Sequence, residues 1–68
     1  MNLSKLSLAG LLKLHAANRE ALEHDDALKL AGLPTTYGVR DFPDWRPWSD
    51  AIEAELDSRG TKYTKLDW

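Results

Sequence analysis

The sequence predicts a small α+β protein. We expect a long amphipathic N-terminal helix, a short second helix, a third helix at 45–59 and one or two short strands, at 35–42 and 61–67. Leucines recur at helical spacing in the first half, whereas residues typical of strands follow Gly32-Leu33-Pro34. Ten of the twelve leucines lie at or before Leu33, and all six aromatic residues follow Pro34. An all-α, helix-turn-helix-like arrangement is the alternative.

The length and composition indicate one small domain spanning residues 1–68. A chain of 68 residues buries only about 60% of its unfolded surface, so its core must pack efficiently or be completed by association. A homo-oligomer is therefore one possibility. There are no cysteines, which rules out a disulfide framework and a thiolate metal site.

The first helix begins after Ser7, a residue that favours the N-cap position. One stripe about 100° wide carries most of its apolar residues. The residues of this stripe are Leu8, Leu11, Leu12, His15, Arg19 and Leu22. Because Leu28 falls off the stripe, we expect a break near 24–26, with Asp25 or Asp26 capping a second helix that ends at Gly32.

The third helix has clear signals at both ends. Asp44 is a suitable N-cap residue, Pro47 is tolerated in the first turn, and Gly60 follows as a stop. The segments 35–42 and 61–67 favour extended backbone. Strands must pair, so we expect them either to form a parallel βαβ unit around this helix or to pair with another protomer.

Residues 42–48 form the most unusual stretch of the chain, because three large rings and two prolines fall within seven positions. Such rings either close a small core or dock a partner, and the sequence leaves both open. Trp68, at the end of the chain given, adds a further ring. We expect this aromatic cluster to bind a protein partner. The predicted partner-binding residues are Phe42, Trp45, Arg46, Trp48 and Trp68.

The sequence shows no sign of catalysis. It lacks the motifs of nucleophilic hydrolases, zinc proteases and phosphate-binding loops. His15 lies alone on an apolar stripe, which favours a packing role. One acidic group has metal-ligand chemistry but is explained more simply as a solvated helix end. Its members are Glu20, Glu23, His24, Asp25 and Asp26. We therefore expect no catalytic residue, no cofactor and no metal site.

These observations predict a cytoplasmic, non-catalytic regulatory or accessory protein that acts by binding another protein. Small chains of this kind are often inhibitors or adaptors of bacteria, phages or mobile elements, although this link rests on chain size and class and not on particular residues. The apolar run from Leu6 to Leu14 is too short and interrupted to span a membrane, and no signal peptide is evident.

DNA binding is the alternative function. Residues 27–33, followed by Thr35-Thr36, resemble the turn of helix-turn-helix DNA-binding proteins. That resemblance implies a DNA-binding segment at 26–42, with Lys29, Arg40 and Arg46 near phosphate. The formal net charge of −2 argues against a nucleic-acid partner without excluding it, because such binders usually carry a basic excess.

Overall fold

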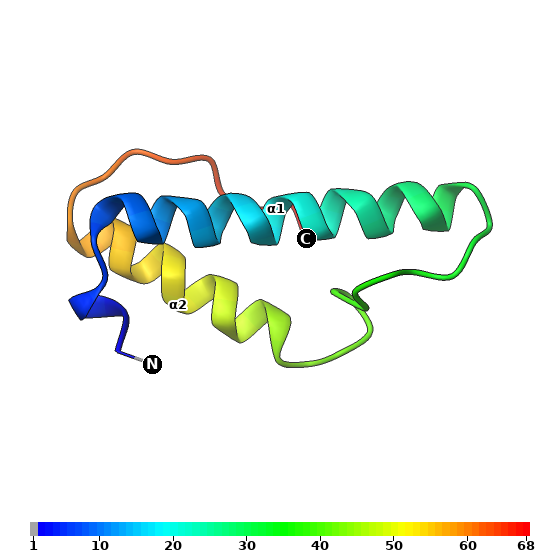
Figure 1. The fold of residues 1–68 in the computed structure, drawn as a ribbon, viewed down its shortest axis with the longest axis horizontal. Helices are drawn as coiled ribbons and strands as arrows, with labels where there is room; N and C mark the ends of the chain where they lie inside the picture. The colour runs from blue at the N-terminus through cyan, green and yellow to red at the C-terminus, as the bar shows by residue number, and fades with distance from the viewer. Residues whose placement is uncertain (1) are drawn as a thin grey trace.

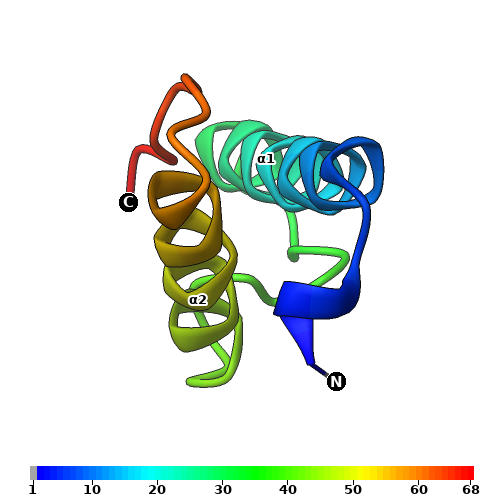
Figure 2. The ribbon, with the colours of Figure 1, turned by 90° about the vertical axis from the view of Figure 1, so that its left-hand side faces the viewer.

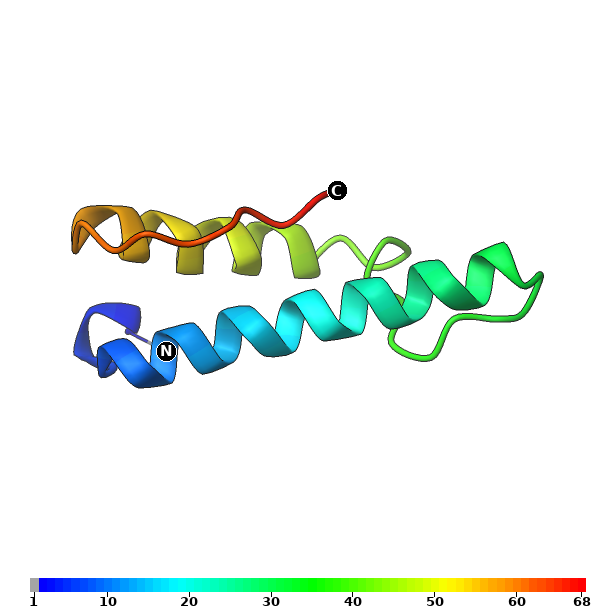
Figure 3. The same ribbon diagram turned by 90° about the horizontal axis from the view of Figure 1, so that it is seen from above.

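A computed structural model describes residues 2–68 and shows a pair of antiparallel helices (Figures 1 and 3). A short 3₁₀ helix, η1 (Leu3–Lys5), precedes α1 (Leu8–Leu30), and α2 (Trp45–Ser58) follows a long loop. No strand occurs over residues 2–68, so the α+β prediction is wrong and the all-α class is the one found. None of the helices in this range combines the length and apolar content needed to cross a bilayer.

Local signals set both ends of α1. Its start after Ser7 is as predicted, whereas Gly32 was predicted to end a separate second helix. The Ser7 hydroxyl accepts a hydrogen bond from the Gly10 backbone N–H at 3.0 Å, which caps the first turn. At the other end Gly32 has a φ of 75°, and the Leu33 N–H bonds the Leu28 carbonyl at 2.9 Å. This is the glycine-terminated ending in which the chain turns away from the helix axis.

The predicted break at 24–26 and the second helix do not exist, because α1 continues through these residues. The leucine pattern fails there because Asp25, which is only 1% exposed, occupies the buried side. Its carboxylate accepts the backbone N–H groups of Thr36 and Tyr37, both at 3.0 Å, and of Val39 at 2.9 Å. Asp25 thus binds the returning loop instead of starting a helix.

These bonds explain why residues 35–42 form no strand. Three backbone N–H groups of the segment already have a carboxylate partner. Burial of the Asp25 carboxyl raises its pKa, but the three N–H bonds outweigh that effect and hold the pKa below its usual value. At Gly38 the backbone has a φ of 65°, and the Phe42 ring lies where a Cβ would project, so another residue here would be strained and would displace this ring.

α2 agrees with the predicted third helix in position and in its stop. Gly60 has a φ of 69°, and the Thr61 N–H bonds the Leu56 carbonyl at 3.1 Å. Its N-terminus differs, since Asp44 adopts helical backbone angles and its side chain makes no cap hydrogen bond. The carboxylate of Asp44 is therefore available for another contact.

The two helices enclose two apolar clusters that combine both halves of the chain. One contains Ala21, Leu22, Val39 and Leu66, with Trp45 and Trp68 packed against it. The other contains Leu11, Ile52 and Leu56, with Leu3, Leu6, Leu14, Trp48 and Tyr63 packed against it. A set of buried polar residues, here called the polar layer, accompanies them. Its members are His15, Asn18, Ser49 and Glu53.

The polar layer is internally paired. His15 Nε2 and Glu53 Oε2 lie 2.9 Å apart, and Asn18 Nδ2 donates to Ser49 Oγ at 3.1 Å. Along α1, His15 and Asn18 lie between Leu11 of one cluster and Ala21 of the other. Pairing of this kind is needed because an unpartnered polar group in a core costs about 1–3 kcal/mol.

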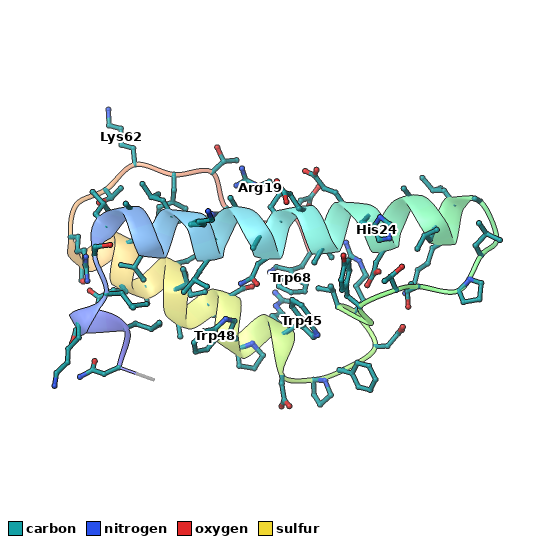
Figure 4. The ribbon with its side chains drawn as sticks, viewed as in Figure 1. Arg19, His24, Trp45, Trp48, Lys62 and Trp68 are labelled. Carbon is teal, nitrogen blue, oxygen red and sulfur yellow. The ribbon has the colours of Figure 1, made fainter. Side chains whose placement is uncertain are left out.

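The segment 61–68 is extended but forms no strand, so the predicted pairing with 35–42 is wrong. Side chains replace a partner strand: Glu53 Oε2 accepts the Leu66 N–H at 3.0 Å, and Arg19 donates to the Thr64 carbonyl. The segment runs back along both helices, on the opposite side of the pair from η1 (Figure 2). Figure 4 shows Arg19 next to it and Lys62 pointing away.

Tyr63 anchors the start of this segment and gives a measurable signal. Burial, followed by a 2.9 Å hydrogen bond to Asp57, raises its pKa from 10.0 to about 12. Because the folded pKa is raised, the neutral phenol stabilises the fold below pH 10, and this stabilisation is lost as the pH rises from 10 to about 12. We expect ultraviolet titration to show one phenolate step near pH 12 that is absent from Tyr63→Phe. A Tyr63 step near pH 10 would contradict the raised pKa and the hydrogen bond to Asp57 that contributes to it.

Candidate partner-binding site

The five residues predicted to bind a partner do not gather at one place. Over residues 2–68 the close aromatic ring pairs are His15 with Tyr63 and His24 with Tyr37, and neither includes a tryptophan or Phe42. The predicted aromatic cluster is therefore wrong. Trp45 and Trp48 pack against different apolar clusters, which separates rings that are close in sequence.

Phe42, Arg46 and Trp68 line one surface hollow of about 490 Å³. The Trp68 ring packs against its own chain, and the Arg46 guanidinium carbon lies 5.7 Å from its centroid, a cation–π distance. Trp68 Nε1 is buried without a hydrogen-bond partner among residues 2–68. Phe42 is 62% exposed. Arg46 and Arg40, which both line this hollow, contact the C-terminal segment: Arg46 stacks on Trp68, and Arg40 donates to the carbonyls of Asp67 and Trp68.

Trp45 and Trp48 line a second hollow of about 430 Å³ with Asn18 and Asp44. We call these four residues the tryptophan hollow. Both rings project from the first turn of α2, whereas Trp68 comes from the C-terminal segment (Figure 4). Both rings are half-buried, so each keeps a solvent-facing part. Because they are three residues apart on a helix, they lie on the same side of it.

The tryptophan hollow continues along α1. An adjoining hollow of about 440 Å³ shares Asn18 and Trp45 and extends over Ala17, Ala21 and His24. No residue of the C-terminal segment lines either one. The two hollows form a surface with small alanine side chains on one helix and large rings on the other. A partner helix or peptide lying on this surface would contact both helices.

Two polar groups of the tryptophan hollow lack partners within residues 2–68. Asn18 is only 7% exposed; its Nδ2 bonds Ser49, but its Oδ1 accepts no hydrogen bond. The Asp44 carboxylate makes neither a hydrogen bond nor an ion pair in this part of the chain. Two acceptors beside two indole rings can orient a bound group as well as bury it.

The sequence interpretation missed Asn18. Its signal was present, since Asn18 lies three residues after His15 and seven after Leu11, which places it on the buried side of α1. The sequence also predicts Asp44 as a helix cap, whereas its side chain makes no cap hydrogen bond. Asp is a common N-cap residue, and only the coordinates show when its side chain does not bond the first turn of the helix that follows.

The geometry does not favour the helix-turn-helix alternative. Residues 31–44 contain no helix that would serve as a recognition helix. The basic residues assigned to phosphate are engaged elsewhere: Arg40 pairs with Asp26 at 2.8 Å, Lys29 pairs with Asp41 at 3.5 Å, and Arg46 stacks on Trp68.

Metal-ligating side chains do not gather in the described part of the chain. No group of three or more His, Asp or Glu side chains over residues 2–68 is arranged to hold a metal ion. His15 is 4% exposed and bonds Glu53, so it serves the interior of the helix pair. Comparison of the chain with protein-family models, curated proteins and solved structures found no match.

Proposed function

We propose that this chain is a non-catalytic, cytoplasmic regulatory or accessory protein that binds another protein. The binding surface is the tryptophan hollow together with its extension along α1 over Ala17 and Ala21. Its occupant is a helix or short peptide of the partner, which lies along both helices in the manner of helix-in-groove recognition.

One observation carries this proposal: two half-buried tryptophans share a hollow that no other segment of residues 2–68 covers. Tryptophan is enriched among residues that dominate binding energy, and its ring gains most when one face is already packed and the other is then desolvated. Trp45 and Trp48 meet the first condition because each packs on an apolar cluster, and a partner in the hollow would supply the second.

The proposal is tested by selecting peptides from a random display library with the intact chain. We expect enriched peptides whose affinity falls about tenfold or more, equal to 1.4 kcal/mol, in Ala17→Arg. The exposed Ala17 lines the surface, so the added side chain obstructs it without removing any core contact. Ala16→Arg is the matched control, because Ala16 is also exposed on α1 but lines neither hollow.

Three outcomes would contradict the proposal. The first is that no peptide is enriched, and the second is that both arginine variants bind equally well. The third is that the selected peptides perturb Phe42 and Trp68 instead of Trp45 and Trp48. Sedimentation across concentrations, run on the same samples, separates partner binding from self-association on this surface.

A further inference from the structure

We infer that the tryptophan hollow recognises a positively charged side chain, arginine or lysine, of the partner. This inference rests on the proposed function and specifies the chemistry of the same site. Three features of the hollow converge on a cation: a carboxylate without a counter-ion, an amide oxygen without a donor, and two indole rings.

The carboxylate supplies the charge. Asp44 lines the hollow and has no ion pair within residues 2–68, although three other acidic residues of this range pair with Lys or Arg. The nearest basic residue in sequence, Arg46, stacks on Trp68 in the other hollow. A guanidinium or ammonium group entering the tryptophan hollow would therefore find an unneutralised anion and form a charge-assisted hydrogen bond.

The rings and the amide supply the rest of the recognition. Cations are attracted to the face of an indole, the best of the aromatic side chains in this respect. Asn18 Oδ1, with no donor of its own in residues 2–68, is an acceptor for a second N–H of the cation. An arginine presents several N–H donors in one plane, so it can reach both oxygens while its alkyl stem lies against the rings.

The helix end does not reverse this preference. The N-terminus of α2 carries a partial positive charge of roughly half an elementary charge, which favours anions. Asp44 places a full negative charge at that end, so the local sum remains negative. Glu20, which lines the adjoining hollow, adds a second acidic group without an ion pair in the described range and extends the negative side of the surface along α1.

The test uses N-acetyl-arginine amide and N-acetyl-citrulline amide, which differ in charge but hardly in shape. Nuclear magnetic resonance of the intact chain reports on the three indole N–H groups separately. Up to about 50 mM probe, we expect the arginine compound to shift the Trp45 and Trp48 signals saturably, and to bind about fivefold tighter than citrulline. The buried Trp68 Nε1 serves as the internal reference.

Variants separate the charge from the fold. Asp44→Asn is expected to bring arginine binding down to the citrulline level, and Asp50→Asn, whose residue lines the other hollow, to leave it unchanged. Neither residue belongs to an apolar cluster. Equal binding of the two probes, no shift with arginine, or unchanged arginine binding in Asp44→Asn overturns the inference. Library peptides that bind this surface without a basic residue would overturn it too, while leaving the proposed function standing.

Discussion

Asp25→Asn is expected to lower the thermal midpoint of this chain by about 20 °C, the largest effect of any single polar substitution. The Asp25 carboxylate holds three backbone N–H groups of the returning loop, those of Thr36, Tyr37 and Val39. Asparagine keeps the shape but has one acceptor oxygen, so its NH₂ group faces either the Val39 N–H or those of Thr36 and Tyr37. The anchor of the loop to α1 would be weakened, and with it the packing of Val39 in the apolar cluster.

The pH dependence of this effect has a definite sign. The pKa of folded Asp25 lies below its usual 3.8, so the ionised carboxylate stabilises the fold at neutral pH. This stabilisation is present above pH 3.8 and is lost as the pH falls through the folded pKa. Thermal midpoints of the wild type and Asp25→Asn should therefore converge in acid below that pH.

Circular dichroism over temperature and pH measures both effects. Glu23→Gln is the control, because Glu23 is exposed on the same helix and has no ion pair within residues 2–68. A midpoint for Asp25→Asn within a few degrees of the wild type would show that the carboxylate does not organise the loop.

Glu53→Ala is expected to reduce the free energy of unfolding by about 3 kcal/mol and to release the C-terminal segment. The Glu53 carboxylate receives the Leu66 N–H at 3.0 Å and lies 2.9 Å from His15 Nε2. Removing it leaves two buried polar groups without a partner. The whole stability of a 68-residue domain is on the order of 3–10 kcal/mol, so the loss is a large fraction.

Hydrogen exchange separates the two parts of this prediction. In Glu53→Ala the Leu66 amide should exchange much faster, whereas exchange of amides in the middle of α1 should speed up only in proportion to the loss of global stability. Tyr63→Phe is the comparison, because it removes the hydroxyl that bonds Asp57 at the start of the segment but leaves Leu66 bonded. Continued protection of Leu66 in Glu53→Ala would show that apolar contacts alone hold the segment.

The aromatic residues of the segment 42–48 are close in sequence but do not form one surface. Phe42, Trp45 and Trp48 lie within seven positions of the sequence, yet Trp45 packs against the cluster of Val39 and Leu66, and Trp48 against that of Ile52. Phe42 covers Gly38 in the loop. The position of each ring depends on the backbone segment to which it is attached. Which of the two hollows a ring lines therefore depends on how the loop and the C-terminal segment return to the helices.

The sequence by itself determined the features that depend on neighbouring residues. Ser7 starts α1, Gly32 and Gly60 end the two helices, and the helix after Asp44 lies where it was predicted. Caps and glycines act within about one turn of the chain, so their effect is readable from a short window. The tryptophan hollow was only half predictable, because Trp45 and Trp48 are local whereas Asn18 comes from the other helix.

Only the tertiary structure decided what the polar and extended residues do. Asp25 was free to cap a helix until a loop 11 to 14 residues away supplied three N–H groups. The segments 35–42 and 61–68 have the composition of strands, but they do not pair with each other. Carboxylates and a guanidinium group of the helices form hydrogen bonds with their backbone instead. Buried backbone groups must find partners, and which ones they find depends on the residues that the fold brings near them.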